Sequence, residues 1–202
     1  MTTFQVSVPK LTGALRRLST VLAIALLTLT LTAAVTGLLI AYYYQPGAGV
    51  AYDSLKVISQ DVNYGWLVRR LHDLAGNALI ILSLVQIVVM FLGERLRRSW
   101  LGAWFTGLFL TLTAMGLSWT AIILDWSQVG YWRMKVELGQ VASIPLIGPT
   151  LAEVLTGGSL GTLTVAHMYA IHSYVLSLAA LGLSIAHLVS LIYQERDMNR
   201  QI

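Results

Sequence analysis

The chain has 202 residues, of which 56% are hydrophobic and only 11% are charged, and its net charge is +4. A soluble domain of this size carries more charge, so the composition predicts a membrane protein. The chain contains no cysteine, which excludes disulfides, zinc–thiolate sites, iron–sulfur clusters and thioether-linked haem built from this chain alone. We expect no nucleic-acid partner, because membrane topology accounts better for the distribution of the basic residues.

Four apolar segments are long enough to cross a bilayer, which takes about 20 helical residues. They cover approximately residues 18–44, 70–93, 103–124 and 166–193. The first follows basic residues, as in a signal peptide, but its apolar run is too long and lacks a clear small-residue cleavage site, so we expect it to remain as a helix. The predicted fold class is an all-α integral membrane protein, a bundle of four transmembrane helices that forms one domain over residues 1–202.

Basic residues set the expected orientation. They are more numerous before the first segment and after the second and fourth than in the two loops on the opposite side. Those on the richer side are Lys10, Arg16, Arg17, Arg95, Arg97, Arg98, Arg196 and Arg200. Because cytoplasmic loops are enriched in Lys and Arg, we predict that both termini are cytoplasmic. We expect a multi-pass protein of a prokaryotic inner membrane or another energy-transducing membrane.

Two loops on the outer side connect the predicted helices. The first contains an amphipathic stretch around Ser54–Ser59, and the second covers residues 125–165 and is rich in Trp, Tyr, Gly and Pro. Within the second, "WRMKVELG" and "PTLAEVLTGG" predict short helices along the membrane surface, each ended by glycine. A loop of about 40 residues is long enough for a binding role, and a passive connection is the alternative.

Histidines on the second and fourth predicted helices are the candidate functional residues. An ionisable side chain within a membrane is costly and suggests function, although a single histidine equally fits a hydrogen bond between helices. His172 and His187 are fifteen residues apart, which is about 22 Å along a helix with about 60° of rotation, so both face roughly the same flank. His72 and His172 both lie near the outer start of parallel helices, so they are suited to clamp a metal porphyrin between them. His167 is about 140° around the helix from His172 and is expected to point elsewhere.

Two residues near His72 fit such a ligand. Gly37 on the first helix gives room for a flat group, although small residues are also common where membrane helices pack. Arg69 lies three residues before His72, where a bidentate contact with a haem propionate is feasible. The alternative is a headgroup anchor, which we prefer for Arg70.

The segments, in their order, resemble cytochrome b6, the four-helix cytochrome b subunit of quinol-oxidising cytochrome bc-type complexes. The resemblance covers nearly the whole chain and rests on "TGLLIAYYYQP", "NYGWLVRRLHDLAGN", "WSQVGYWRMKV", "IPLIGPTLAEVLTGG" and "YAIHSYVL". It implies two b haems across the membrane, each clamped between the second and fourth helices. The implied metal ligands of the outer haem are His72 and His172. Arg69 would lie near its propionates, and Gly37 where the porphyrin edge passes.

The inner haem site departs from the family pattern. The resemblance implies His187 as one metal ligand and, as the other, the residue fourteen positions after His72, which here is Gln86. An amide is a poor iron ligand beside imidazole, and Gln86 could instead hydrogen-bond His187. Ala23 stands where the family has a glycine, which narrows the same slot. Three alternatives stay open: the inner haem is absent, which we favour; it is five-coordinate on His187; or another group supplies the ligand.

Two further departures affect the ends of the predicted helices. Asp125 precedes Trp126 where the family has proline, close to the outer quinol pocket. Val21 stands near the family's cysteine for an additional covalent haem, so none is expected.

Together these features predict a haem b membrane subunit with one secure outer-side haem b. It would transfer electrons between the quinone pool and a redox partner within a larger respiratory or photosynthetic complex, and would not be a complete enzyme by itself. The alternatives are a two-haem subunit of a full Q-cycle complex and a haem-free scaffold. Expected partners are other membrane and redox subunits and quinone or quinol, with a homodimer as the family's usual state.

Overall fold

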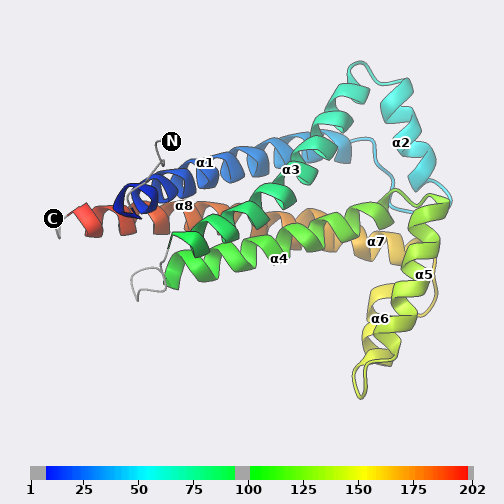
Figure 1. The fold of residues 1–202 in the computed structure, drawn as a ribbon. Coiled ribbons are helices and arrows are strands. Elements are labelled where there is room, and N and C mark those ends of the chain that lie inside the picture. Colours follow the sequence, from blue (N-terminus) through cyan, green and yellow to red (C-terminus); the bar gives the residue numbers. More distant parts are fainter. Residues whose placement is uncertain (1–7, 94–100, 200–202) are drawn as a thin grey trace, which may run out of the picture. The chain divides into compact units, whose positions relative to one another are not determined.

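The structure is a computed structural model that describes residues 8–93 and 101–199. Within these residues it is all-helical, as the four apolar segments predict (Figure 1). The long helices are α1 (Val8–Ala41), α3 (Gly65–Leu92), α4 (Leu101–Leu124) and α8 (Ser177–Asn199). The shorter elements are α2 (Ala51–Gln60), α5 (Gln128–Ala142), α6 (Gly148–Thr156), α7 (Thr162–Ala170) and the π-helical turn η2 (Ile171–Leu176).

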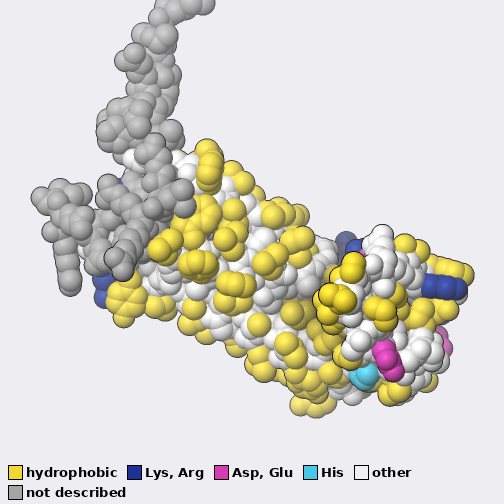
Figure 2. All heavy atoms as spheres, turned by 90° about the horizontal axis from the view of Figure 1, so that it is seen from below, with side chains coloured by type: hydrophobic (Ala, Val, Ile, Leu, Met, Phe, Trp, Pro, Cys, Tyr) yellow, Lys and Arg dark blue, Asp and Glu magenta, His cyan; other side chains and the backbone are white. Residues whose placement is uncertain are grey.

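Four helical stretches of the described chain are long and apolar enough to cross a membrane. They are Thr12–Ala41, Gly65–Leu92, Leu101–Leu124 and Thr162–Arg196. Only 22% to 39% of the residues in the most apolar part of each are buried inside the protein. Hydrophobic side chains are spread over the face shown in Figure 2, and charged side chains are sparse there. Apolar side chains exposed along whole helices indicate contact with lipid, which confirms the predicted all-α membrane fold.

Two of the long helices begin earlier than the sequence predicts. α1 begins at Val8 and α3 at Gly65, whereas the apolar runs suggested starts near residues 18 and 70. The hydrogen-bonded backbone continues through polar residues that an apolar window leaves out. Four basic residues that define the expected orientation lie outside the described residues, so the orientation stays a prediction. They are Arg95, Arg97, Arg98 and Arg200.

The chain divides into two compact units. Unit 1 contains Met1–Leu31, Ala75–Ala114 and Ala179–Ile202, and unit 2 contains Thr32–Leu74 and Met115–Leu178. Helices α1, α3 and α4 therefore each contribute one part to each unit. The prediction of a single domain stays a prediction.

Each unit has its own hydrophobic core. The core of unit 1 contains Ala23, Met90, Ala103 and Leu191. Unit 2 has two clusters, one around Ile58 and Val165 and the other around Met134 and Met168. The amphipathic α2 buries its apolar face in the first of these clusters. Helices α5 and α6, where the sequence predicts surface helices, pack side by side as a hairpin (Figure 1).

The turn between α4 and α5 is built for close packing within unit 2. A Cβ atom on Gly130 would lie 2.5 Å from the carbonyl oxygen of Ile122, so only glycine permits this approach. Trp126 has a φ of +43°, a left-handed conformation that is costly for a bulky residue. The hydroxyl of Ser127 accepts a hydrogen bond from the backbone N–H of Gly130 and caps α5. These contacts hold the Trp126 side chain in a defined place.

Candidate functional site: a histidine pair and its counterpart

His72 of α3 and His172 of η2 face each other in unit 2. Their ring centroids are 6.3 Å apart, and the ring planes meet at 54°. An imidazole nitrogen lies about 2 Å from a first-row metal that it binds and about 1.1 Å from its own ring centroid, so two imidazoles on one ion have centroids about 6 Å apart. The spacing of this pair therefore fits two ligands of a single metal ion.

Hydrogen bonds determine which nitrogen of His72 carries the proton. The hydroxyl oxygen of Thr36 lies 3.2 Å from His72 Nδ1 and 2.6 Å from the carbonyl oxygen of Thr32. Because its one proton is donated to that carbonyl, the hydroxyl accepts from Nδ1–H. The carbonyl oxygen of Ala33, 3.0 Å from the same nitrogen, can only accept. His72 is therefore protonated on Nδ1 and keeps a lone pair on Nε2.

The same reasoning applies to His172. The hydroxyl of Thr120 donates to the carbonyl oxygen of Gly116 at 2.8 Å and lies 2.8 Å from His172 Nδ1. It therefore accepts from Nδ1–H, which leaves the lone pair of His172 on Nε2. Within the described part of the chain, neither Nε2 has a hydrogen-bond partner. Both histidines are thus in the tautomer whose Nε2 lone pair is free to bind a metal.

Gly37 contacts this pair directly. A Cβ atom at this position would lie 3.0 Å from His72 Cε1, which is tighter than ordinary van der Waals contact. Glycine therefore lets the imidazole ring approach α1, where the backbone of Ala33 and the hydroxyl of Thr36 hold it. The family resemblance implies a place for Gly37 beside a porphyrin edge, and in the structure the atoms nearest its Cβ position belong to the ring of His72.

The π-helical turn accounts for the unequal spacing of the paired positions. On α3, His72 and Gln86 are fourteen residues apart, whereas His172 and His187 are fifteen apart. A π turn accommodates one extra residue within an otherwise α-helical run, and His172 lies in η2. The additional residue is therefore absorbed at His172 itself.

Gln86 and His187 form the corresponding pair in unit 1, but they bond directly to each other. Gln86 Nε2 lies 2.9 Å from His187 Nε2 and 3.1 Å from the carbonyl oxygen of Ser19. The two side chains are only 1% and 0% exposed. Two ligand nitrogens that share a metal ion lie about 4 Å apart, which is twice a bond of about 2 Å. This pair therefore does not fit an iron between its two side chains.

The surroundings of His187 nevertheless resemble those of His72. The carbonyl oxygen of Ala103 lies 3.1 Å and the hydroxyl oxygen of Thr106 3.2 Å from His187 Nδ1. A Cβ atom on Gly107 would lie 3.0 Å from His187 Cε1. The hydroxyl of Thr106 donates to a backbone carbonyl, so it accepts from Nδ1–H, and the lone pair on Nε2 accepts from the Gln86 amide.

A short repeated motif underlies this likeness, and the sequence reasoning missed it. "AAVTG" at 33–37 and "AWFTG" at 103–107 share the pattern Ala-x-x-Thr-Gly. In each copy the alanine carbonyl and the threonine hydroxyl hold a histidine Nδ1, and the glycine makes room for the ring. The repeat is the signal that could have identified Thr36 and Thr106.

The amide of Gln86 has only one suitable orientation. Turned over, its oxygen would face the Nε2 lone pair of His187 and the Ser19 carbonyl, which is repulsive. As oriented, both contacts are satisfied, but the Gln86 oxygen is buried without a partner among the described residues. An unpaired buried acceptor costs about 1–3 kcal/mol. Gln86 and His187 are therefore hydrogen-bonded directly to each other, and the Gln86 oxygen is the one polar atom of this contact without a partner among the described residues.

The guanidinium of Arg69 is bound by the protein itself. Its Nη2 lies 3.0 Å from Asp125 Oδ1. Its Nη1 donates to the hydroxyl of Ser59 at 3.1 Å and to the carbonyl oxygen of Leu55 at 3.3 Å. Pairing of Arg69 with a propionate stays a prediction.

Asp125 also influences a buried tyrosine. The hydroxyl of Tyr44 donates to the carbonyl oxygen of Leu124 at 2.8 Å. Burial, and then the negative charge of Asp125, raise the pKa of Tyr44 well above its usual value. Tyr44 therefore acts as a neutral hydrogen-bond donor that ties the end of α1 to the end of α4.

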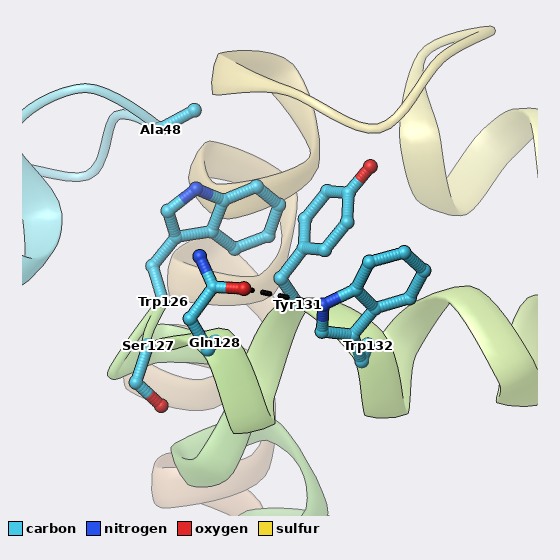
Figure 3. Close-up of a pocket in the computed structure, with 6 residues that line it drawn as sticks. All are labelled: Ala48, Trp126, Ser127, Gln128, Tyr131 and Trp132. Carbon is cyan, nitrogen blue, oxygen red and sulfur yellow. Dashed lines mark hydrogen bonds between the residues drawn. The ribbon is translucent and has the colours of Figure 1, made fainter.

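An open cleft of about 410 Å³ lies beside Asp125 in the turn between α4 and α5 (Figure 3). It is lined by Ala48, Trp126, Ser127, Gln128, Tyr131 and Trp132. Tyr131 meets both Trp126 and Trp132 edge to face, with centroids 5.7 and 5.4 Å away, and Trp132 donates to the Gln128 side chain at 3.2 Å. Trp126, Tyr131 and Trp132 thus form an aromatic wall on one side of this cleft.

The remaining histidine is elsewhere. His167 lies on α7, near the end of α6: its Cε1 would be 3.6 Å from a Cβ atom on Gly157.

Among the described residues, no three His, Cys, Asp or Glu side chains lie close enough together to hold a metal ion by themselves. A metal ion between His72 and His172 therefore needs its other ligands from a prosthetic group, and a porphyrin, with four nitrogens, provides them.

Comparison with known proteins identifies the family. A family model described as "Cytochrome b/b6/petB" matches residues 10–195. Cytochrome b6 of Tupiella akineta is 31% identical over 161 residues, which is 79% of this chain and 75% of that protein. Cytochrome b6 of a Picosynechococcus species is 31% identical over 153 residues, 75% of this chain and 69% of that one.

A solved structure shares the fold. A chain of a "Hyperthermophilic respiratory Complex III" superposes with a TM-score of 0.68 at 19% sequence identity, covering 93% of this chain. This chain spans about half of that one, 48% of its length. The family match and the two relatives agree with the four apolar helices and with the resemblance in sequence. The chain therefore belongs to the cytochrome b/b6 family of haem-binding electron-transport proteins of the membrane.

Proposed function

We propose that the chain is a haem b subunit that transfers electrons between the quinone pool and a redox partner, and that it holds one b haem between His72 and His172. The single observation that carries the proposal is the geometry of this pair. The centroids of the two neutral imidazole rings are 6.3 Å apart. Nδ1 of His72 is hydrogen-bonded to α1 and Nδ1 of His172 to α4, so Nε2 of each ring is left unused. A haem bound there supplies a one-electron iron couple.

The residues around the pair keep the ligands in place. Thr36 and Ala33 hold His72, and Thr120 holds His172. Hydrogen bonds of this kind fix the tautomer and the ring orientation and make the imidazole more basic. Both histidines lie within membrane-spanning stretches, and neutral imidazole is the form of histidine that binds metal.

The contact between Gln86 and His187 supports one haem per chain. Gln86 and His187 lie where a second pair of iron ligands would be expected. Because they are hydrogen-bonded directly to each other, there is no room for an iron between them. Ala23 is fully buried within the core of unit 1, so it occupies space there. Without a second haem, electron transfer through this chain is confined to the side of His72 and His172, which we place at the outer face.

The aromatic cleft beside Asp125 supports a site for quinone or quinol. Its rigid Trp and Tyr side chains suit a flat ring, and it belongs to the same unit as His72 and His172. The partners we propose are the other membrane and redox subunits of a larger respiratory or photosynthetic complex, with a homodimer as its core. The proposed location is a prokaryotic inner membrane or another energy-transducing membrane.

A second candidate is a subunit with two b haems in a full Q-cycle complex. Its support is the intact surroundings of His187, which Ala103, Thr106 and Gly107 hold as their counterparts hold His72. An iron would then bind His187 alone, and the Gln86 side chain would have to move away. A haem-free scaffold has no such support, because the unused Nε2 atoms of the first pair would serve no purpose in it.

The test is the haem content of the purified protein by pyridine haemochrome assay, with a reduced-minus-oxidised spectrum. We expect one low-spin b haem per chain. His72→Ala or His172→Ala should abolish this signal, and His187→Ala should leave it in place. Two haems per chain would favour the second candidate, and none would favour the scaffold.

A further inference from the structure

Asp125 and Arg69 form an ion pair one helical turn from His72. Nη2 of Arg69 lies 3.0 Å from Oδ1 of Asp125. The side chains are 30% and 36% exposed, so the pair is partly shielded from solvent. Arg69 is three residues before His72 on α3, which places both on the same face of the helix.

The guanidinium is also fixed to α2. It donates to the hydroxyl of Ser59 and to the carbonyl oxygen of Leu55, so three of its five N–H groups have protein partners. Ser59 in turn donates to the same Leu55 carbonyl at 2.8 Å. The arginine therefore lies between α2 and the end of α4, with Asp125 as its only anionic partner among the ion pairs of the described residues.

We propose that Asp125 is a positioning residue that holds Arg69 in this place, cancels most of its charge, and thereby lowers the reduction potential of the haem between His72 and His172. The inference rests on the proposed function. It differs from the role that the family resemblance implies for Arg69, in which the positive charge serves a propionate.

The sign of the effect follows from electrostatics. Reduction adds one negative charge at the iron, so a nearby uncompensated positive charge stabilises the reduced form and raises the potential. Asp125 opposes that effect of Arg69. Removing the carboxylate should raise the potential, and removing the guanidinium should lower it, because Asp125 is then unpaired.

The experiment is a redox titration of the purified haem-loaded protein, followed by optical spectroscopy. Asp125→Asn should shift the midpoint upward and Arg69→Gln should shift it downward. The double variant should lie near the wild-type value, and Arg69→Lys, which keeps the charge, should move it least of the single variants at these two positions. Asp53→Asn is the matched control, because Asp53 pairs with Lys56 on the exposed side of α2, 3.9 Å apart, and should leave the midpoint unchanged.

A second readout needs no haem. In the haem-free protein, Asp125→Asn and Arg69→Gln should both speed hydrogen exchange of the α2 amides, because Arg69 ties α2 to α3. Exchange that stays slow in both variants would show that the pair does not hold Arg69 on α2.

The outcomes separate this inference from the proposed function. A normal haem spectrum with an unmoved midpoint in Asp125→Asn, or shifts of the same sign in both single variants, would overturn the role of Asp125 alone. A wild-type chain that binds no haem would overturn the proposed function and this inference with it.

Discussion

At the scale of single residues, threonine hydroxyls determine what the histidines can do. Thr36, Thr106 and Thr120 each donate their proton to a carbonyl one turn back on their own helix. Each can then only accept from a histidine Nδ1–H, so all three histidines present Nε2 on the opposite side. The threonine hydroxyls thus determine which nitrogen of each histidine keeps a lone pair.

Thr36→Val should weaken haem binding without abolishing it. Valine keeps the shape of threonine but cannot accept from His72 Nδ1–H, and the Ala33 carbonyl remains as one acceptor. Loss of a hydrogen bond to a metal-bound histidine costs roughly 10–100-fold in affinity, and we expect the lower end, measured by titrating haem into the haem-free protein. Thr106→Val removes the same contact at His187 and should leave the affinity unchanged. An equal loss in both variants would argue for a second haem at His187.

Gly37→Ala should reduce the haem retained per chain. The added methyl group would lie 3.0 Å from His72 Cε1, so the ring must shift away from the carbonyl and hydroxyl that orient it. Gly76→Ala on α3 is the control, since nothing lies within 4 Å of its Cβ position. The control should keep its haem and gain up to about 1 kcal/mol of helix stability. Full haem retention in Gly37→Ala would show that the ring has space to spare.

At the scale of elements, the long helices surround two pairs of side chains in a similar way: His72 with His172, and Gln86 with His187. α1 carries one Ala-x-x-Thr-Gly motif, which holds His72 of α3, and α4 carries the other, which holds His187 of α8. The residue that α3 contributes to each pair is His72 in unit 2 and Gln86 in unit 1. The difference between the two settings therefore lies mainly in one side chain of α3.

Gln86→His, combined with Ala23→Gly, should add a second haem. The change replaces a hydrogen-bond donor by a second imidazole opposite His187, and the glycine clears the space that Ala23 fills in the core of unit 1. The haem content should rise from one to two per chain in the pyridine haemochrome assay. Gln86→Leu is the control: it leaves His187 Nε2 and Ser19 without their donor, so it should lower thermal stability by about 1–3 kcal/mol without adding haem.

At the scale of the whole molecule, the prediction to test is the orientation of the chain in the membrane, with both termini cytoplasmic. The absence of cysteine permits single-cysteine labelling without any background. Gln140→Cys on the exposed part of α5 should react with a membrane-impermeant maleimide only from the outer side. Thr2→Cys should react only from the cytoplasmic side. Labelling of Gln140→Cys exclusively in inverted vesicles would reverse the predicted topology.

Much of the fold followed from the sequence, because its determinants are local along the chain. Runs of about 20 apolar residues must form helices in lipid, since unpaired backbone groups there are too costly. The helical spacing of His172 and His187, together with the equal depth of His72 and His172, then pointed to a pair of histidines for one metal. The resemblance to cytochrome b6 then singled out Gln86 as a departure from the family pattern.

Only the tertiary structure decided which groups meet. No spacing in the sequence joins Asp125 to Arg69, which are 56 residues apart. Nor does the sequence give the tautomer of a histidine, because that depends on which carbonyls and hydroxyls of another helix reach Nδ1. The hydrogen bond between Gln86 and His187 is predicted from the family resemblance, and the structure confirms it. The sequence by itself determined the membrane helices and the candidate ligands, since these depend on hydrophobicity and helical period. The contacts that leave Nε2 of His72 and His172 unbonded, and that bond Nε2 of His187 to Gln86, depend on packing between distant segments.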